Sequence, residues 1–156
     1  MNDKPKCLLD HFVRDHGGKI ISDGDLDGIF ATGLLVWYLR GSNIDVAYSF
    51  PRPDELRGLV VSRCILVELP LTRCLVYRDE NLLVDHHNGP ARIELFMGDK
   101  VIERCTLNDV KSVAELVAKV LDADVDPELL DAVNQVELGE YRTLLAEMLH
   151  KAYLLN

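Results

Sequence analysis

Three short apolar runs, each with an acidic residue at or next to its end, limit the folds open to this chain. They cover residues 19–22, 64–69 and 81–85. Apolar runs of this length without polar alternation are typical of parallel strands whose sheet is covered on both faces. Directly after the first run, the apolar pattern becomes helical from Gly28 to Arg40. A strand, an acidic loop and a helix in this order predict an α/β fold.

The remaining pattern extends this prediction over the whole chain as one domain, residues 1–156. We expect helices over residues 6–15, 28–40, 54–61, 111–121, 127–136 and 140–154. We expect strands over residues 19–22, 44–50, 64–69, 74–78, 81–85, 92–97 and 100–104. The last two strands flank Gly98-Asp99 and predict a hairpin. The architecture is therefore a mostly parallel sheet with flanking helices, a late β-hairpin and a helical C-terminal third.

The charge and the composition exclude several classes of protein. A formal net charge of −9 opposes unspecific binding to duplex DNA, which depends on neutralising phosphates, and favours a protein partner or a small substrate. No apolar run reaches the roughly 18 residues of a membrane span, and the N-terminus lacks the apolar core of a secretory signal. We expect a cytoplasmic protein that does not interact with membranes. The four cysteines form no CxxC pair, which predicts free thiols rather than a zinc site.

Three aspartates alternate in the loop after the first strand, at positions 23, 25 and 27. Side chains two residues apart in extended chain point the same way, so Asp23, Asp25 and Asp27 can converge. Three crowded carboxylates repel one another unless cations or protons compensate them. An EF-hand is excluded because Leu34 occupies the position of its bidentate glutamate and a strand precedes the loop. Capping of the following helix is the alternative role for this turn.

Asp85-His86-His87 ends another predicted strand, ahead of the turn Asn88-Gly89-Pro90. Adjacent side chains of a strand point to opposite faces, so one histidine would bind a metal ion while the other faces a substrate. Simple surface exposure of both histidines is the alternative. Because parallel strands end at one edge of a sheet, the triplet and the acidic loop together predict a metal site there.

These residues resemble a known family. The stretch 23–28 resembles the first motif of the DHH phosphoesterase superfamily, in particular its RecJ-like branch, and 83–87 resembles the motif that gives the superfamily its name. The stretch 112–117 is similar to the helix that follows in RecJ-like proteins. The resemblance implies a parallel five-stranded domain that binds one or two manganese or magnesium ions. It also implies hydrolysis of phosphodiester or phosphoanhydride bonds.

The resemblance assigns roles position by position. Asp25 and Asp27 match metal-binding aspartates, and Asp23 is a further candidate ligand. His86 matches the metal-binding histidine. Asp85 and His87 are the candidate catalytic residues: Asp85 would support His86, and His87 would face the substrate.

Several positions depart from the family pattern. Ile21 stands where the family has a metal-binding histidine. Glu68 replaces the second-motif aspartate, which often bridges both ions. The fourth-motif aspartate has its best counterpart in Glu137, with Asp131 and Glu140 as weaker choices. The second domain that holds the substrate in most members has no counterpart in this chain.

Three functions are consistent with this pattern. The first is a metal-dependent hydrolase acting on a small nucleotide or a short single-stranded nucleic acid, with Arg52, Arg57 and Arg92 as candidate phosphate contacts. The second is a catalytically degenerate domain in a DNA replication or repair complex, associated with GINS and the helicase. The third is a regulatory module that binds a nucleotide without cleaving it. The partner would be a replication protein or a second copy of the chain, and the helical tail would either bind it or pack on the sheet.

Overall fold

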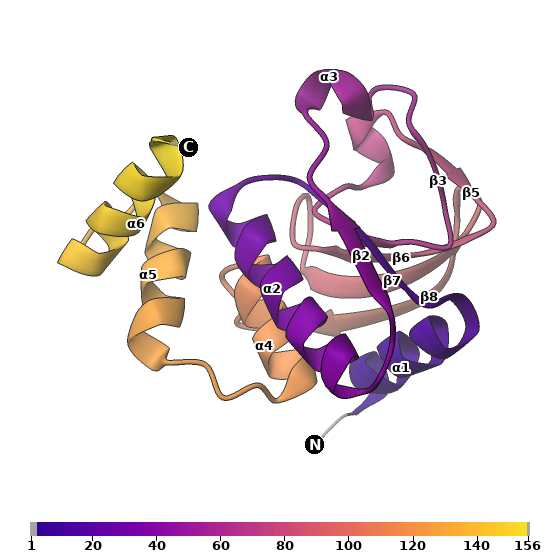
Figure 1. Cartoon of the computed structure of the whole chain (residues 1–156), viewed down its shortest axis with the longest axis horizontal. Helices are drawn as coiled ribbons and strands as arrows, with labels where there is room; N and C mark the ends of the chain where they lie inside the picture. The colour runs from indigo at the N-terminus through magenta and orange to yellow at the C-terminus, as the bar shows by residue number, and fades with distance from the viewer. Residues whose placement is uncertain (1–2, 156) are drawn as a thin grey trace.

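A six-stranded mixed sheet forms the centre of the molecule (Figure 1). The computed structural model describes residues 3–155. In spatial order the strands are β2 (Val46–Ser49), β1 (Gly18–Ser22), β4 (Ile65–Val67), β6 (Glu80–Asp85), β7 (Ala91–Met97) and β8 (Lys100–Leu107). The first four run parallel, and β7 and β8 form the expected antiparallel hairpin at one side. The sheet is thus mostly parallel, as expected, but it is mixed and has six strands instead of five.

Three helices cover one face of the sheet: α1 (Lys4–His16), α2 (Leu26–Gly41) and α4 (Val113–Leu121). Leu9, Leu35 and Leu116, one from each helix, are almost completely buried together with Ile20 and Val84 of the strands. The α/β class and the helical covering of the sheet are therefore as expected from the sequence.

The opposite face is covered by the segment between β2 and β6 rather than by a full helix. This segment contains α3 (Pro53–Leu56), β3 (Val60–Ser62), η1 (Leu71–Arg73) and β5 (Val76–Arg78). β3 and β5 pair with each other in a separate two-stranded parallel sheet. Leu66 and Leu83 of the main sheet are buried against this layer.

Two predicted elements of that layer are corrected. The expected helix over residues 54–61 ends at Leu56 because Gly58 adopts a left-handed conformation, with φ of +77°. The expected strand over residues 74–78 begins only at Val76, since Cys74 is also left-handed, with φ of +65°. That strand does not belong to the main sheet.

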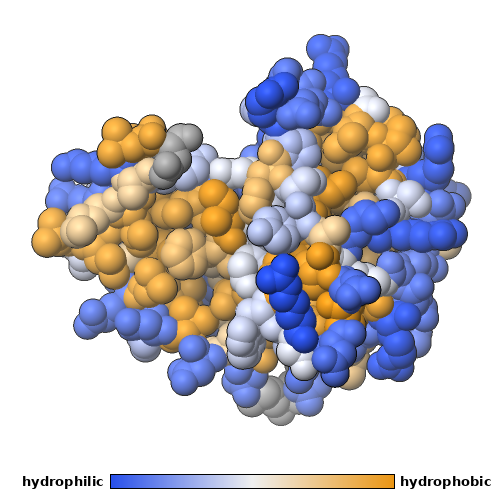
Figure 2. All heavy atoms as spheres, in the orientation of Figure 1, coloured by the Kyte–Doolittle hydropathy of each residue, from blue (hydrophilic) through white to orange (hydrophobic). Residues whose placement is uncertain are grey.

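The chain ends in α5 (Pro127–Leu138) and α6 (Leu144–Leu154), which lie against each other (Figure 1). Thr143 caps α6 by accepting from the amide of Ala146, so this helix begins later than residue 140. Ala146 is the one residue of α6 that is buried, and the helix packs on α5 instead of on the sheet. Figure 2 shows the resulting hydrophobic surface over this end of the molecule.

Two further observations bear on sequence-based expectations. Within residues 3–155, no helix combines the length and the apolar character that crossing a membrane requires. The four cysteines carry free thiols, of which Cys64 and Cys105 are buried while Cys7 and Cys74 are exposed.

The strand order determines where a ligand can bind. The chain passes from β1 to β2 on one side and later to β4 on the other, so the order reverses between β1 and β4. Crevices at such reversals, at the carboxyl ends of parallel strands, are the usual ligand sites of open α/β sheets. The acidic loop follows β1, Glu68 follows β4, and the two histidines follow β6.

Candidate metal centre

The acidic loop turns tightly into α2 at the carboxyl end of β1. Asp25 is the N-cap of α2, and its Oδ1 accepts a hydrogen bond of 2.7 Å from the amide of Gly28. A Cβ atom at Gly28 would lie 2.2 Å from the backbone oxygen of Asp23 and 3.0 Å from Glu68 Oε2, so only glycine fits there. Carboxylate oxygens of Asp23, Asp25 and Glu68 lie within 4.8 Å of one another. Asp25 therefore both caps the helix and belongs to an acidic group.

Asp27 lies in the first turn of α2 and is almost fully buried. Its two oxygens accept hydrogen bonds of 2.9 and 2.7 Å from the amides of Val113 and Ala114, at the beginning of α4. Oδ2 also lies 3.6 Å from His86 Nε2. Burial raises the pKa of Asp27, although the two amides oppose the shift. Asp27 thus joins α2 to α4 and also lies next to His86.

Glu68 directly follows β4 and is completely buried. Its backbone is left-handed, with φ of +59°, which turns the side chain into the space between the other site residues. Neither carboxylate oxygen has a hydrogen-bond partner among the described residues. Burial, and after it the neighbouring Asp25 and Asp27, raise the pKa of Glu68 far above its usual value. A carboxylate in this position needs either a proton or a cation.

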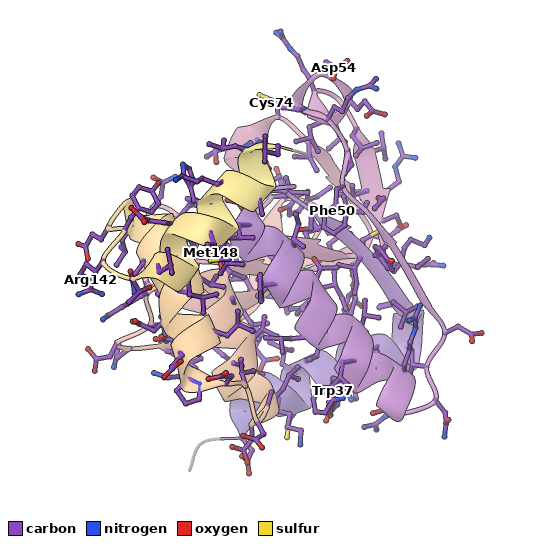
Figure 3. All side chains as sticks on the ribbon, turned by 60° about the vertical axis from the view of Figure 1, so that its left-hand side comes forward. Trp37, Phe50, Asp54, Cys74, Arg142 and Met148 are labelled. Atoms are coloured by element: carbon purple, nitrogen blue, oxygen red, sulfur yellow. The ribbon has the colours of Figure 1, made fainter. Side chains whose placement is uncertain are left out.

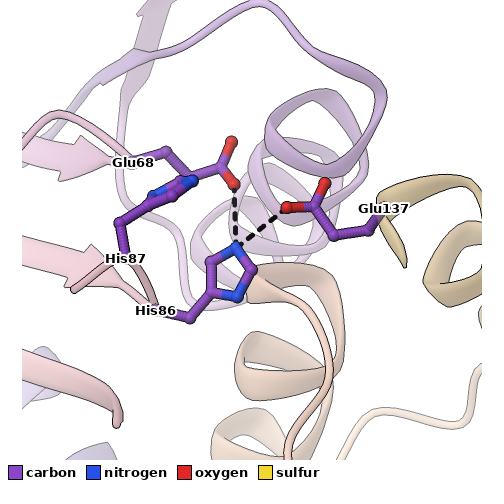
Figure 4. A group of neighbouring side chains, drawn as sticks. All are labelled: Glu68, His86, His87 and Glu137. Atoms are coloured by element: carbon purple, nitrogen blue, oxygen red, sulfur yellow. Dashed lines mark ion pairs between the residues drawn. The ribbon is translucent and has the colours of Figure 1, made fainter. Parts of the chain in front are cut away.

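Three carboxylates surround Nε2 of His86, and Figure 4 shows two of them, those of Glu68 and Glu137. The nitrogen lies 3.1 Å from Glu137 Oε1, 3.5 Å from Glu68 Oε1 and 3.6 Å from Asp27 Oδ2, and it makes no hydrogen bond. Two ligands of one ion, bound at about 2.1 Å, lie roughly 3.0 Å apart at right angles and roughly 3.4 Å apart at the tetrahedral angle. The distances from Nε2 to the oxygens of Glu137 and Glu68 are close to those between two ligands of one divalent ion.

His86 and His87 both belong to one cluster of possible metal ligands, which corrects the expectation that their side chains would face opposite ways. Ligand atoms of Glu68, His86, His87 and Glu137 all lie within 4.8 Å of one another. β6 ends at Asp85, so the alternation of strand side chains no longer applies to the residues that follow. The two imidazole rings stand 4.6 Å apart, centroid to centroid.

Asp85 supports His87, whereas the sequence assigned it to His86. Nδ1 of His87 donates to Oδ1 of the buried Asp85 at 2.7 Å, and this hydrogen bond raises the pKa of His87. The other carboxylate oxygen of Asp85 faces Arg92 at 3.4 Å. Asp85 therefore fixes the orientation of the histidine whose ring lies at the outer side of the group.

The three arginines predicted to contact phosphate either lie away from the site or already form hydrogen bonds with other residues. Arg92 donates to Glu94 and to the backbone oxygens of His87 and Pro90, so its guanidinium supports the loop after β6. Arg52 is exposed and pairs with acidic neighbours in α3. Arg57 is exposed as well.

One cationic residue of the site was not predicted. Arg73 in η1 donates from Nη1 to Asp23 Oδ2 at 2.9 Å. The two residues are 50 positions apart in the chain, and nothing in the pattern around Arg73 marks it as functional. The β4–η1 turn brings it to the acidic loop because that turn leaves the same edge of the sheet as Glu68.

Of the three candidates for the fourth-motif acidic residue, Glu137 is the one that reaches the site. Glu137 reaches His86 from α5, whereas Asp131 binds Gln135 of its own helix and Glu140 is exposed. Ile21 packs against the hydrophobic cluster that contains Leu66 and Leu83. Its side chain offers no metal ligand, so the position at which the resembled family has a histidine contributes none.

The donor set consists of carboxylate oxygens with imidazole nitrogen and contains no thiolate among the described residues. A buried cluster of two glutamates and histidine that can hold a metal ion is thus a property of this fold. In comparisons with known proteins, no family model, no curated protein and no solved structure matches this chain, so its function must be argued from the site itself.

Proposed function

We propose that this chain is a DHH-type phosphoesterase domain that binds Mn²⁺ or Mg²⁺ at this centre. Its reaction is hydrolysis of a phosphodiester or phosphoanhydride bond in a small nucleotide or a short single-stranded nucleic acid. The ligands are Asp25, Glu68, His86 and Glu137, with Asp27 and Asp23 at the periphery of the centre.

The observation that carries the proposal is the environment of Glu68. Both of its oxygens are buried without a hydrogen-bond partner among the described residues, and Oε1 lies 3.5 Å from Nε2 of His86. Leaving an ionised carboxylate buried and unpaired costs several kcal/mol. A proton would offset this cost for Glu68 alone, whereas a divalent ion would also use Nε2 of His86 and the carboxylate of Glu137. The cluster therefore favours metal binding over a purely structural role.

Bound divalent ions supply a water of lowered pKa as nucleophile and charge stabilisation for the phosphoryl oxygens. The chain's own residues then orient the reaction. His87, held through Nδ1 by Asp85, keeps Nε2 for proton transfer to the leaving oxygen. Asp85 is therefore a positioning residue, and His87 is the candidate general acid.

Calorimetric titration with Mn²⁺ tests the proposal on the wild-type protein and on Glu68→Gln. We expect micromolar binding by the wild type and at least a tenfold loss in the variant, because the amide removes the charge at the centre of the cluster. Glu128→Gln is the matched control, since Glu128 is an exposed glutamate in the first turn of α5. Binding that is equal in all three proteins would refute the metal centre.

The same proteins then enter an activity screen with short single-stranded oligonucleotides, cyclic dinucleotides and pyrophosphate. Turnover that requires Mn²⁺ and disappears in Glu68→Gln and in His87→Gln supports the hydrolase. Metal binding without turnover of any of these substrates would favour the alternative, a domain that no longer catalyses.

The exposed apolar side of the C-terminal helix favours that second candidate function, a partner-binding domain in a replication or repair complex. Leu144, Met148 and Leu154 of α6 are 71%, 57% and 65% exposed. Asp25→Ala separates the two functions, because an enzyme loses turnover while a binding domain retains its partner.

A further inference from the structure

A small pocket opens beside the metal centre, between the η1 turn and the loop that follows β6. It is lined by Glu68, Pro70, Thr72, Arg73, His87 and Asn88. Glu68 and His87 belong to the metal-binding group, so the pocket shares a wall with it. The hydroxyl, amide and guanidinium groups on the remaining walls are hydrogen-bond donors, which is the composition that an anionic group requires.

Arg73 provides the positive charge of this pocket. Nη1 donates to Asp23 at 2.9 Å, and the side chain is 37% exposed. A guanidinium carries five N–H donors, and Asp23 is its one hydrogen-bonded side-chain partner among residues 3–155. The remaining donors can therefore bind a second anion while Asp23 holds the group in position.

Both walls of the pocket are fixed by hydrogen bonds from outside it. On one side, the hydroxyl of Tyr77 donates to the backbone oxygen of Leu69, next to the lining residue Pro70. On the other side, Arg92 donates to the backbone oxygens of His87 and Pro90, both at 3.0 Å. A site held in this way loses little conformational entropy when a ligand binds.

We propose that this pocket binds a phosphoryl group of the substrate, with Arg73 as the residue that positions it against the metal centre. The proposal rests on the function proposed above and assigns the phosphate contact to a residue other than Arg52, Arg57 and Arg92. The carboxylates of the acidic loop repel a phosphate until metal ions neutralise them. Phosphate binding at Arg73 therefore depends on Mn²⁺.

Calorimetry with inorganic phosphate tests the assignment, first on metal-free protein and then on protein saturated with Mn²⁺. The variants are Arg73→Gln, Arg73→Lys and the control Arg78→Gln. Arg78 is an exposed arginine that precedes β6, at the end of that strand opposite to Asp85. Each variant is also titrated with Mn²⁺, and thermal melting confirms that it is folded.

In the Mn²⁺-loaded protein we expect Arg73→Gln to bind phosphate at least about tenfold more weakly, because one charge-assisted contact is lost. Arg73→Lys should retain an intermediate affinity, since lysine keeps the charge without the planar fork. Arg78→Gln should match the wild type. The affinity of all variants for Mn²⁺ should be unchanged, and the metal-free wild type should bind phosphate at least tenfold more weakly than the loaded one.

Other results distinguish the two proposals. Equal phosphate affinity in Arg73→Gln and Arg78→Gln, with normal Mn²⁺ binding, overturns the pocket and leaves the metal centre intact. Loss of Mn²⁺ binding in Arg73→Gln also overturns the phosphate assignment, because it makes Arg73 a support for Asp23. A wild-type protein that takes up no Mn²⁺ overturns the metal centre, and the pocket assignment fails with it.

Discussion

Glu68 affects the stability of the fold through both its backbone and its side chain. Its left-handed backbone and its buried, unpartnered carboxylate are both unfavourable by themselves. Both become useful when a cation displaces the proton of Glu68, because the carboxyl group is then already desolvated and correctly placed. The stability of the metal-free protein should therefore carry the cost of this residue, and the metal-loaded protein should not.

That cost gives a pH dependence with a defined sign. Because the pKa of Glu68 is raised in the folded state, the folded protein holds a proton that the unfolded chain releases above about pH 4.3. Without metal, the free energy of unfolding should fall as the pH rises from about 5 to 8. The fall approaches about 1.4 kcal/mol per pH unit for one retained proton.

Urea unfolding across this range, in chelator and in Mn²⁺, measures the effect. Glu68→Gln cannot ionise and should lack this part of the slope, so the difference between the two proteins isolates Glu68. Mn²⁺ displaces the proton and should abolish the fall in the wild type. Identical slopes for wild type and variant in chelator would contradict the assignment.

For individual residues, the sequence predicted which residues form the site better than it predicted which of them pair with each other. Glu68 and His86 converge, and Asp25 lies near Glu68, because the ends of parallel strands share an edge, which the pattern of apolar runs already implied. Glu137 joins Glu68 and His86 from α5. The pairing of Asp85 with His87 depends on where β6 ends. The pairing of Arg73 with Asp23 depends on the path of an irregular turn, and local sequence encodes neither.

Among the elements, α2 links the site to the core most directly. Its N-terminal turn holds Asp25 and Asp27, while Leu35 and Leu39 are buried under the sheet. The close approach at Gly28 lets this turn pass beneath the acidic loop and Glu68. The position of the carboxylates is therefore coupled to the packing of the whole helix.

Two glycines of α2 make this coupling testable. Gly28→Ala places a methyl group against the Asp23 backbone and should both destabilise the protein and weaken Mn²⁺ binding. Gly33→Ala is the matched control, because a Cβ atom at Gly33 meets nothing within 4 Å. It should raise the free energy of unfolding by about 0.5–1 kcal/mol through helix propensity.

Thermal melting and Mn²⁺ calorimetry on both variants check the prediction. We expect a lower melting temperature and weaker metal binding for Gly28→Ala alone. Gly33→Ala should melt about 2–4 °C higher per kcal/mol gained, with unchanged metal affinity. Normal metal binding by Gly28→Ala would show that the loop can shift without cost.

Elements with a complete local signal were predicted well. The hairpin of β7 and β8 and the two helices α4 and α5 have both a clear apolar pattern and a turn or cap at their ends. The segment between β2 and β6 was predicted less well. Its short apolar runs form a second layer, and left-handed Gly58 and Cys74 break them at places that periodicity does not reveal.

At the scale of the whole molecule, α6 carries an apolar surface that is exposed to solvent. Figure 3 labels Met148 on α6, which is 57% exposed. Leu144 is 71% exposed on the same helix as Met148. This surface contributes little to the stability of a single chain, because its side chains are already in water.

Replacing Leu144 and Met148 together by glutamine should therefore change the free energy of unfolding of the monomer by less than about 1 kcal/mol. Urea unfolding measures this change, and sedimentation shows whether the wild type and the variant have the same mass. A loss of several kcal/mol would mean that α6 is buried in the folded protein. A smaller mass for the variant would assign this surface to a dimer between copies of the chain.

The site residues lie far apart along the chain, and this has a consequence for synthesis. Asp27 binds the amide of Ala114, 87 residues further on, and His86 meets Glu137 of α5. During translation, the acidic loop and both histidines leave the ribosome well before the last ligand is made. A nascent chain therefore carries an incomplete set of ligands until α5 emerges, so the metal should be acquired after translation of nearly the whole domain.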